Sequence, residues 1–434
     1  MMERPMAFKP HVIAWNLTQR CNLRCAHCYL DASHREEGAR GELRGAECLR
    51  LVDQIAEVGT DLFLILTGGE PLLREDIFDI ARYASEQGFT VVIGTNGTLI
   101  DPELAGKMAD AGIQGAGVSL DSLKPELHDA FRGRRGAWEQ AVRGIEALKE
   151  VGLEFLIQMT VTQDNCGEVS EIAEFSFKAG AKGFNLFFLV CTGRGEDLTD
   201  LDPAQYERTL TDLYPIQRRY EGRMLVRAKC APHYQRIVYE HDPNAPLLRA
   251  YSGACPAGTR YCRISPEGEV TPCPYMPLAV GNLREKRFAE IWRDSKILRN
   301  LRDPELKGRC DVCEFRTLCS GCRARAYAHA GDYLGEDPRC AYQPGQYGYE
   351  RIALGEGETS GPEIPRGMRW TAEAQARQKR IPLFVRRMAT ARVERFARDR
   401  GYDRITPEVM KEARAKLVEE PRGGFPRLPW LKTK

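Results

Sequence analysis

The chain has 434 residues, enough for two or three domains, and its 63 Lys or Arg and 61 Asp or Glu give a net charge of +2. This near balance argues against a polyanionic partner, so we expect no nucleic acid to bind. The 43% hydrophobic content is typical of a globular protein, and no apolar run reaches the roughly 18 residues of a membrane span, which excludes an integral membrane protein. The first dozen residues lack the apolar stretch of a signal peptide, and we expect a cytoplasmic location.

The charge is distributed unevenly along the chain. Residues 366–434 hold 19 Lys or Arg against 8 Asp or Glu, a surplus of +11 that leaves −9 for the remainder. A basic tail on a mildly acidic body indicates a separate module with its own partner, for instance an acidic small molecule.

The first half of the chain alternates short apolar runs with amphipathic stretches. The predicted strands are residues 12–16, 62–66, 90–93, 115–120, 155–161 and 184–190. The predicted helices between them are residues 46–57, 77–86, 102–111, 138–149 and 167–178. Apolar strands that alternate with helices indicate βα units around a parallel sheet. Six such units predict an α/β fold, a partial (β/α)6 barrel of the TIM type, with its chemistry at the carboxyl ends of the strands.

The pattern changes after a predicted helix at 203–220. Residues 230–340 are rich in turns and cysteines, which is typical of a segment that depends on metal for its fold. A stretch rich in Gly, Pro and Glu follows, and further helices are predicted at 371–380, 382–400 and 407–418. The expected segments are a core at 10–222, a cysteine-rich domain at 223–345, a linker at 346–368, a small basic helical domain at 369–420 and a tail at 421–434.

Fifteen cysteines are the strongest compositional signal. In a reducing compartment, clustered cysteines are more often metal ligands than disulfides. Cys21, Cys25 and Cys28 follow the first predicted strand, and three thiolates so close together can hold three irons of a 4Fe-4S cubane and leave the fourth iron open to a ligand. The alternatives are a zinc loop, for which His27 is the nearby fourth ligand, or chance clustering.

Three further motifs follow successive predicted strands: Gly68-Gly69-Glu70-Pro71, Thr95-Asn96-Gly97 and Ser119-Leu120-Asp121. Paired glycines let a backbone approach a ligand closely, and a hydroxyl with a carboxylate can bind ribose hydroxyls. Each motif alone is typical of an ordinary turn. On successive strand ends they predict one pocket.

In this order and spacing, CNLRCAHCY, GGEP and SLDS resemble the core of a radical S-adenosylmethionine enzyme over roughly residues 10–195. The resemblance implies a catalytic 4Fe-4S cluster on Cys21, Cys25 and Cys28, whose open iron binds the amine and carboxylate of S-adenosylmethionine. An electron from the cluster then yields a 5′-deoxyadenosyl radical that takes hydrogen from the substrate. The predicted cofactor-binding residues are Gly68, Gly69, Glu70 and Pro71 beside the methionine part, Ser119 and Asp121 near the ribose, and Thr95 and Asn96 in the same pocket.

Eight more cysteines form a second block: Cys255, Cys262, Cys273, Cys310, Cys313, Cys319, Cys322 and Cys340. Eight thiols is the number that two four-cysteine clusters need. An alternative is one structural zinc site on residues 310–322, whose paired CxxC spacing suits tetrahedral sulfur but leaves the other four cysteines without a role.

The block resembles the SPASM accessory domain of radical S-adenosylmethionine enzymes, which carries auxiliary 4Fe-4S clusters. The resemblance implies an inner cluster on Cys255, Cys262, Cys273 and Cys322, and an outer cluster on Cys310, Cys313, Cys319 and Cys340. Some relatives keep one auxiliary cluster, and the short spacing between Cys319 and Cys322 departs from the family pattern. The partition of the ligands, and the choice between one and two clusters, therefore stay open.

Three further residues have two possible interpretations each. Cys230 and His233 suit a ligand of substrate or metal as well as a structural role. Arg194, after the sixth predicted strand, suits a clamp for a carboxylate as well as a solvated loop residue.

The basic tail predicts an amphipathic module of two or three helices, with Val385, Met388, Val393, Phe396 and Ala397 as its buried stripe. The composition alone favours a small helical bundle that docks to or stabilises the rest of the protein, with its charges in solvent. Its Ile381-Pro382, Phe384-Val385-Arg386, Glu394, Gly401 and Ile405-Thr406 resemble the C-terminal domain of the catalytic subunit of dark-operative protochlorophyllide reductase. There the domain lies near a propionate-bearing tetrapyrrole, which a surplus of arginine suits.

Both resemblances lead to the hypothesis of an enzyme that oxidatively removes or modifies carboxylate side chains of a tetrapyrrole, a haem precursor. Hydrogen would leave the side-chain carbon beside the ring, carbon dioxide or acetate would follow, and one electron would pass to an auxiliary cluster. The expected partners are an iron tetrapyrrole and an unidentified low-potential electron donor.

The alternative is a radical peptide or protein maturase, although the first strand begins too early to leave room for an N-terminal leader-binding domain. A non-enzymatic iron-sulfur electron carrier is a third class. It would need no open iron, and the three-cysteine loop disfavours it.

Overall fold

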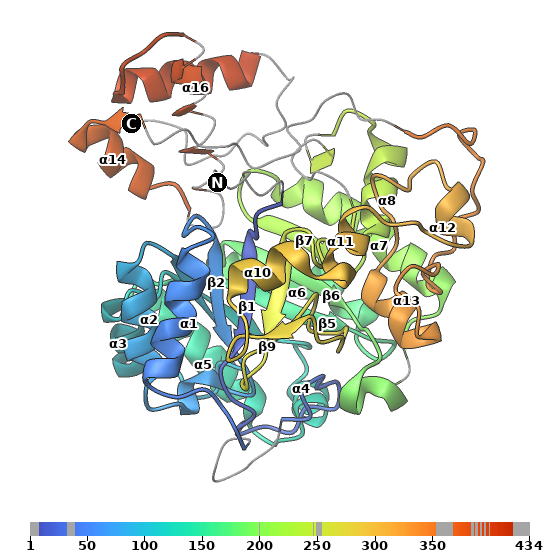
Figure 1. The fold of residues 1–434 in the computed structure, drawn as a ribbon, viewed down its shortest axis with the longest axis horizontal. Coiled ribbons are helices and arrows are strands. Elements are labelled where there is room, and N and C mark those ends of the chain that lie inside the picture. Colours follow the sequence, from blue (N-terminus) through green and yellow to red (C-terminus); the bar gives the residue numbers. More distant parts are fainter. Residues whose placement is uncertain are drawn as a thin grey trace.

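The computed structural model describes residues 8–32, 40–198, 200–245, 247–248 and 254–352, and residues 368–419 with gaps at 383–385, 387–388, 391–392, 395 and 399. Within these ranges the chain forms a barrel, a cysteine-rich auxiliary segment and a small C-terminal helical module (Figure 1).

The barrel is built from alternating strands and helices. Its elements are β1 (Val12–Asn16), α1 (Ala46–Ala56), β2 (Phe63–Thr67), α2 (Ile77–Glu86), β3 (Thr90–Thr95), α3 (Pro102–Asp110), β4 (Gly115–Ser119), α4 (Pro125–Arg132), α5 (Ala137–Glu150), β5 (Glu154–Val161), α6 (Val169–Ala179), β6 (Gly183–Phe188), α7 (Pro203–Tyr220) and β7 (Leu225–Lys229). Short 3-10 turns cover Pro71–Leu73, Cys166–Glu168 and Gly193–Asp197. The predicted α/β partial barrel is confirmed, and its six predicted strands lie within two residues of the observed ends.

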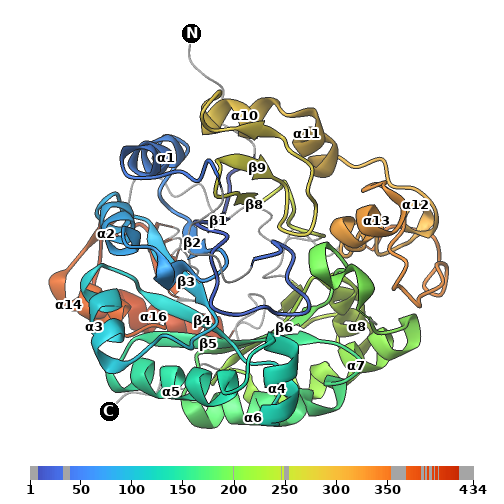
Figure 2. The same cartoon turned by 90° about the horizontal axis from the view of Figure 1, so that it is seen from below.

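Strands β1 to β7 pair in parallel in sequence order, with Val12 opposite Phe63 and Leu156 opposite Gly183. Helices cover the outer face of this sheet (Figure 2). The strand residues that face the helices must therefore be apolar, and Leu64, Val91 and Phe184 have no exposed surface. Because all seven strands run in one direction, their carboxyl ends meet at one end of the barrel.

The auxiliary segment extends the same sheet. It contains α8 (His233–His241), β8 (Tyr261–Ile264), β9 (Glu269–Thr271), β10 (Gly281–Asn282), α10 (Phe288–Asp294), α11 (Lys296–Arg302), α12 (Arg309–Val312) and α13 (Arg323–Ala330). Strand β8 pairs in parallel with β1, with Cys262 opposite Ile13, and β9 and β10 continue as an antiparallel hairpin. The sheet therefore has ten strands and crosses the domain boundary expected at 222/223.

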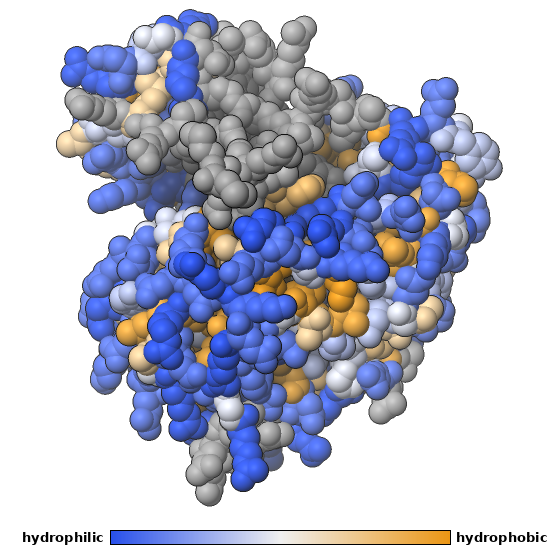
Figure 3. All heavy atoms as spheres, viewed as in Figure 1, coloured by the Kyte–Doolittle hydropathy of each residue, from blue (hydrophilic) through white to orange (hydrophobic). Residues whose placement is uncertain are grey.

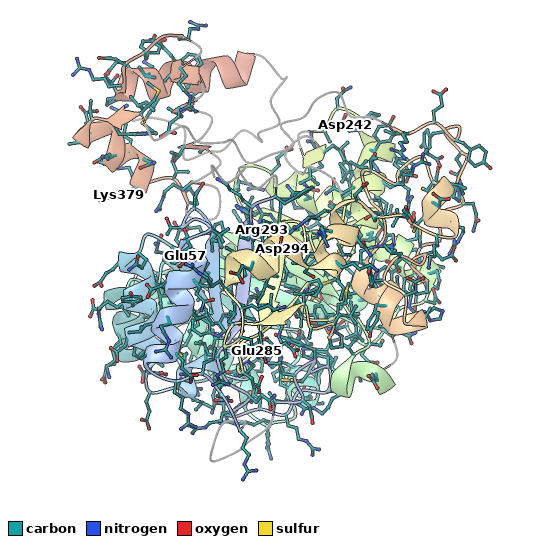
Figure 4. All side chains as sticks on the ribbon, in the orientation of Figure 1. Glu57, Asp242, Glu285, Arg293, Asp294 and Lys379 are labelled. Atoms are coloured by element: carbon teal, nitrogen blue, oxygen red, sulfur yellow. The ribbon has the colours of Figure 1, made fainter. Side chains whose placement is uncertain are left out.

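Helix α10 fixes this segment to the outside of the barrel. The indole of Trp292 is fully buried and donates a hydrogen bond to the carbonyl of Phe8 at 2.8 Å. Arg287, directly before α10, pairs with Glu57 at the end of α1, and Figure 4 labels Glu57, Arg293 and Asp294 on these two neighbouring helices. One apolar core therefore runs from the barrel helices into the auxiliary segment.

The C-terminal module has a core of its own. It comprises β11 (Arg369–Trp370), α14 (Ala372–Lys379), β12 (Arg404–Ile405) and α16 (Pro407–Glu419). Its buried residues include Val393 and Ala397 from the predicted stripe, with Phe396 packed against them, whereas Val385 and Met388 lie outside the described residues. The predicted helix at 382–400 also falls partly outside them. In Figure 1 this module lies beyond the amino ends of the barrel strands, away from the end where the predicted site motifs gather.

The face drawn in Figure 3 is mostly hydrophilic, with separate small apolar areas. Among the described residues, no helix has the length and apolar composition that a bilayer crossing requires.

The separate cores predict that the C-terminal module can be removed without loss of the barrel. Among the described residues, the two apolar clusters share no member. A chain ending at residue 352 should keep its iron content and shift the midpoint of its main thermal transition by less than about 2 °C. Calorimetry and an iron assay on both chains would measure this. Aggregation of the shortened chain, or loss of iron, would contradict it.

Candidate active site and iron-sulfur sites

Cys21, Cys25 and Cys28 lie in the loop that leaves β1 and crosses the open end of the barrel (Figure 2). The three side chains belong to one small buried cluster with Leu23 and Ala137. Burial raises the pKa of Cys21 to about 12 and also raises the pKa of Cys25. A thiolate here therefore needs a compensating positive charge, which bound iron supplies.

The Gly68-Gly69-Glu70 turn lies directly on the backbone of this cysteine loop. The amide of Gly69 donates to the carbonyl of Thr18 at 2.7 Å, and the amide of Glu70 donates to the carbonyl of Arg20 at 2.8 Å. A Cβ atom at Gly69 would lie 2.1 Å from the Arg20 oxygen, and one at Gly68 would lie 2.6 Å from the Thr18 oxygen. The two glycines are required because two backbones approach each other here.

Glu70 connects this turn to the end of β3. Its buried carboxylate accepts hydrogen bonds from the Thr95 hydroxyl at 2.9 Å, the Asn96 amide at 2.9 Å and the Leu72 amide at 3.2 Å. Burial raises the pKa of Glu70 to about 7. The Asn96 side chain in turn donates to Asn22 of the cysteine loop at 2.8 Å. The structure thus brings residues 68–71, 95 and 96 together around the cysteine loop.

Asp121 and Ser119 both lie at the end of β4, but Asp121 already has protein partners. Its carboxylate accepts hydrogen bonds from Arg132 at 2.6 Å and from the Thr160 amide at 2.9 Å. Burial alone would raise the pKa of Asp121, but Arg132, the nearby histidines and the Thr160 amide together outweigh burial and lower it. Arg132 also places its guanidinium 3.7 Å from the Cys25 sulfur. Asp121 therefore orients a cation at the cysteine loop, and a contact with ribose stays a prediction for it and for the half-buried Ser119.

Arg194 and His27 complete the surroundings of this loop. Arg194 donates to the Cys25 carbonyl at 3.1 Å and pairs with Asp31 at 2.6 Å, while its remaining terminal nitrogen is buried without a partner in the described structure. The His27 ring stacks on Phe131, with ring centroids 4.3 Å apart. Burial lowers the pKa of His27 to about 3, so the ring is neutral at pH 7. The arginine holds the loop, and its unpartnered nitrogen keeps the carboxylate-clamp interpretation open.

In the auxiliary segment, three of the four cysteines expected at the inner cluster lie together. Cys322 hydrogen-bonds the Cys255 sulfur, which lowers the pKa of Cys255. Cys322 and Cys273 pack in one small apolar cluster. Cys262 does not belong to this group, because its side chain lies in the main core with no exposed surface. Cys230 takes a place in the small cluster instead.

The four cysteines expected at the outer cluster line one cavity of about 380 Å³, which includes the solvent at its mouth. These residues are Cys310, Cys313, Cys319 and Cys340. His233 and Asp337 reach the same cavity, with the His233 Nε2 atom 3.2 Å from Asp337 Oδ2.

The two auxiliary groups are linked by the buried Asp337. Its carboxylate accepts a hydrogen bond from the Cys322 amide at 2.7 Å and from Arg325 at 2.9 Å. Arg325 continues to the Cys230 carbonyl at 2.8 Å and to the Tyr206 hydroxyl. The auxiliary segment is thereby fixed to the end of β7 and to α7.

The donor set fits iron-sulfur clusters better than the zinc alternatives. Within the described ranges, no three His, Cys, Asp or Glu side chains lie close enough together to share one metal ion. A 4Fe-4S cubane does not need ligands that meet at one ion, because each thiolate binds a different iron and the ligands surround the whole cluster. Three groups of buried and half-buried cysteines suit such clusters.

Sequence reasoning missed several residues around these sites. Arg132 ends α4, which was not predicted although Pro125 at its start and Gly133 at its end are typical helix boundary signals. Asn22 lies inside the quoted motif but carries no signal beyond its position. Arg325 contacts Cys230 and Asp337 contacts His233, each about a hundred residues away, so no local pattern identifies them.

The backbone contact at Gly69 predicts a specific loss of the first cluster. In Gly69→Ala the new methyl group would force the turn away from the Arg20 carbonyl, and about four of the twelve irons expected for three clusters should be lost after anaerobic reconstitution. Gly106→Ala is a matched control, because a Cβ there meets no atom within 4 Å. Equal iron contents in the two variants would show that the close approach does not matter.

The Asp121–Arg132 pair predicts a loss of stability. In Asp121→Asn the buried guanidinium of Arg132 keeps its charge but loses its partner, which should lower the free energy of unfolding by about 3–5 kcal/mol. The exposed pair between Glu103 and Lys107 is the control, and Glu103→Gln should leave the unfolding midpoint almost unchanged because water screens both charges. Denaturant unfolding measures both. An unchanged Asp121→Asn protein would mean that the carboxylate serves a ligand rather than the fold.

Three family models match separate parts of the chain. Residues 15–176 match the radical SAM superfamily, and residues 255–322 match the SPASM iron-sulfur cluster-binding domain. Residues 370–414 match the family described as proto-chlorophyllide reductase 57 kD subunit.

Curated relatives cover most of the chain. It is 43% identical over 350 residues to the AdoMet-dependent heme synthase of Methanosarcina barkeri, which covers 79% of this chain and 99% of that protein. The Fe-coproporphyrin III synthase of the same organism is 33% identical, covering 79% of this chain and 90% of that protein. The mycofactocin maturase MftC of Mycolicibacterium smegmatis is 31% identical, covering 76% and 82%.

Solved structures share the fold. SuiB of Streptococcus suis bound to S-adenosylmethionine superimposes with a TM-score of 0.62 at 20% identity, covering 77% of this chain and 78% of that chain. The anSMEcpe structure with bound AdoMet and a peptide gives 0.59 at 20% identity, covering 76% and 94%. With its core, its cysteine-rich segment and its relatives in agreement, the chain belongs to the radical SAM superfamily, among the SPASM-bearing enzymes related to the AdoMet-dependent heme synthases.

Proposed function

We propose that this radical SAM enzyme oxidatively removes or modifies carboxylate side chains of an iron tetrapyrrole. The 43% identity to a heme synthase over almost the whole of that protein carries the proposal. A pre-heme d1 synthase, 32% identical over 357 residues, is a further relative named for a haem-type product. When bound, the cluster and S-adenosylmethionine supply a 5′-deoxyadenosyl radical that takes hydrogen from the substrate.

The chain itself would hold the first cluster with Cys21, Cys25 and Cys28. Gly68, Gly69, Glu70, Pro71, Thr95, Asn96, Ser119 and Asp121 would surround S-adenosylmethionine or support the residues that do. The cysteine loop lies across the mouth of the barrel (Figure 2), so it would limit the access of water to the reacting atoms.

A cation suited to a substrate carboxylate lies beside this loop. Arg263 projects from β8 and donates to the side chain of Asn16 at the end of β1, which donates to the Tyr29 hydroxyl at 2.8 Å. Tyr29 follows Cys28 directly, and its ring lies 5.2 Å from that of Tyr275 near the auxiliary cysteines. No carboxylate of the described residues pairs with Arg263. A guanidinium without an acidic partner between the two cysteine groups suits a propionate side chain.

The remaining partners are inferred from the same chemistry. A reduced cluster needs a low-potential electron donor, whose identity is open. None of the fifteen cysteines, all within the described ranges, is joined in a disulfide, which suits a reducing compartment such as the cytoplasm. The balanced net charge of +2 gives no reason to expect nucleic acid as a partner.

A radical peptide maturase is the second candidate, because maturases are among the relatives at 31% identity. The two functions differ in what binds before any chemistry occurs. Titration of the anaerobic protein with iron-coproporphyrin III should shift the porphyrin absorption band, and a generic cysteine-containing peptide should not compete. Reduced protein with S-adenosylmethionine should release 5′-deoxyadenosine faster when the porphyrin is present. Binding of the peptide with no change in the porphyrin band would refute the tetrapyrrole proposal.

Arg263 predicts a binding defect that leaves the clusters intact. Arg263→Gln removes the charge that would face a propionate, so affinity for iron-coproporphyrin III should fall roughly 10- to 100-fold, while iron content stays the same. Arg284→Gln is the control, because Arg284 lies on the surface and pairs with Glu47. Unchanged affinity in Arg263→Gln would show that this arginine does not contact the substrate.

A further inference from the structure

Cys230 adopts a backbone conformation that few residues tolerate. It directly follows β7 and has φ of +57°, in the left-handed region. A residue with a side chain is disfavoured there, and such strain is retained mainly at functional positions. Ala254, at +55°, directly precedes Cys255, and Ser320, at +54°, lies between Cys319 and Cys322. The strained positions of the auxiliary segment thus gather at its cysteines.

Hydrogen bonds fix Cys230 close to Cys322. One nitrogen of Arg325 donates to the Cys230 carbonyl at 2.8 Å, and another donates to Asp337 at 2.9 Å. The same Asp337 oxygen accepts the Cys322 amide at 2.7 Å. One buried ion pair therefore holds both cysteine backbones.

The side chains of these cysteines share one buried neighbourhood. Cys230, Cys273 and Cys322 pack in the same small cluster with Val190 and Met276. Cys255 joins them through its hydrogen bond with Cys322. Four thiols that are far apart in the sequence thus meet at the carboxyl end of the barrel.

Cys262 faces the opposite side of the sheet. Along β8, Tyr261 and Arg263 are partly exposed whereas Cys262 and Ile264 are fully buried, as expected when side chains alternate. The charged neighbour of Cys262 is Arg302, whose guanidinium lies 4.6 Å from the centre of the Trp292 ring in the outer helix layer. To reach the other cysteines, Cys262 would have to cross the sheet.

We propose that Cys230, together with Cys255, Cys273 and Cys322, ligates the inner auxiliary iron-sulfur cluster, and that Cys262 is a core thiol. This replaces the ligand set that motif spacing implied. It rests on the auxiliary cluster that belongs to a SPASM domain and is independent of the tetrapyrrole substrate. Because Cys230 lies at the end of a barrel strand, the cluster would join the barrel to the auxiliary segment.

Paired substitutions test the assignment on full-length protein reconstituted anaerobically with iron and sulfide. Cys230→Ala should lose about four of roughly twelve irons, or keep them with altered g values in the electron paramagnetic resonance spectrum of the reduced protein. Cys262→Ala should keep the iron content and the spectrum of the parent. Cys48→Ala, another fully buried core thiol, is the control for packing loss.

Two results would overturn the assignment. One is loss or alteration of the inner cluster in Cys262→Ala while Cys230→Ala keeps the parent spectrum. The other is a Cys230→Ala protein with unchanged clusters whose iron-coproporphyrin III band no longer shifts, which would make Cys230 a ligand of the substrate iron. Neither readout of the clusters requires a substrate, so failure of this assignment would leave the proposed function untouched.

Discussion

The auxiliary half of the molecule is organised around one buried carboxylate. Asp337 has no exposed surface, and it accepts hydrogen bonds from the Cys322 amide, Arg325 and the Arg339 amide. Burial alone would raise the pKa of Asp337, but Arg325, His233 and the Cys322 amide together outweigh burial and lower it. A buried charge is tolerated only when its partners are fully formed, so this residue requires α13, the 230–233 turn and the cysteine-rich loops to be in place together. Both auxiliary cysteine groups depend on that arrangement.

On the barrel side the decisive contacts are made by backbone atoms. The turn at residues 68–70 bonds to carbonyls of the cysteine loop, and Glu70 carries the connection on to Thr95 and Asn96. Three strand ends are thus joined by contacts within the protein itself. A site of this kind holds its ligands in a fixed relation, which is what control of a reactive radical demands.

The sequence was most informative where chemistry and local pattern coincide. Apolar strands of parallel sheets are easily recognised, so β1 to β6 and the motifs that follow them were predicted within two residues. Spacing alone could not place Cys262, because the face of the sheet on which it lies depends on how β8 pairs with β1. The prediction for Asp121 was also incomplete. Its partner Arg132 lies on helix α4, which the apolar pattern did not reveal. Ion pairs between distant residues, such as Asp200 and Arg339, have no signature in the sequence at all.

The pairing of β8 with β1 has a consequence for how the chain is made. Val12 emerges 249 residues before its partner Tyr261, which follows only after all seven parallel strands of the barrel have been translated. Until then the outer edge of β1 presents unpaired amides and carbonyls, a template on which another nascent chain can add a strand. Folding is therefore expected to be slow, and neighbouring nascent chains on one polysome could pair at this edge. Chaperones that cover the edge should raise the yield of folded protein.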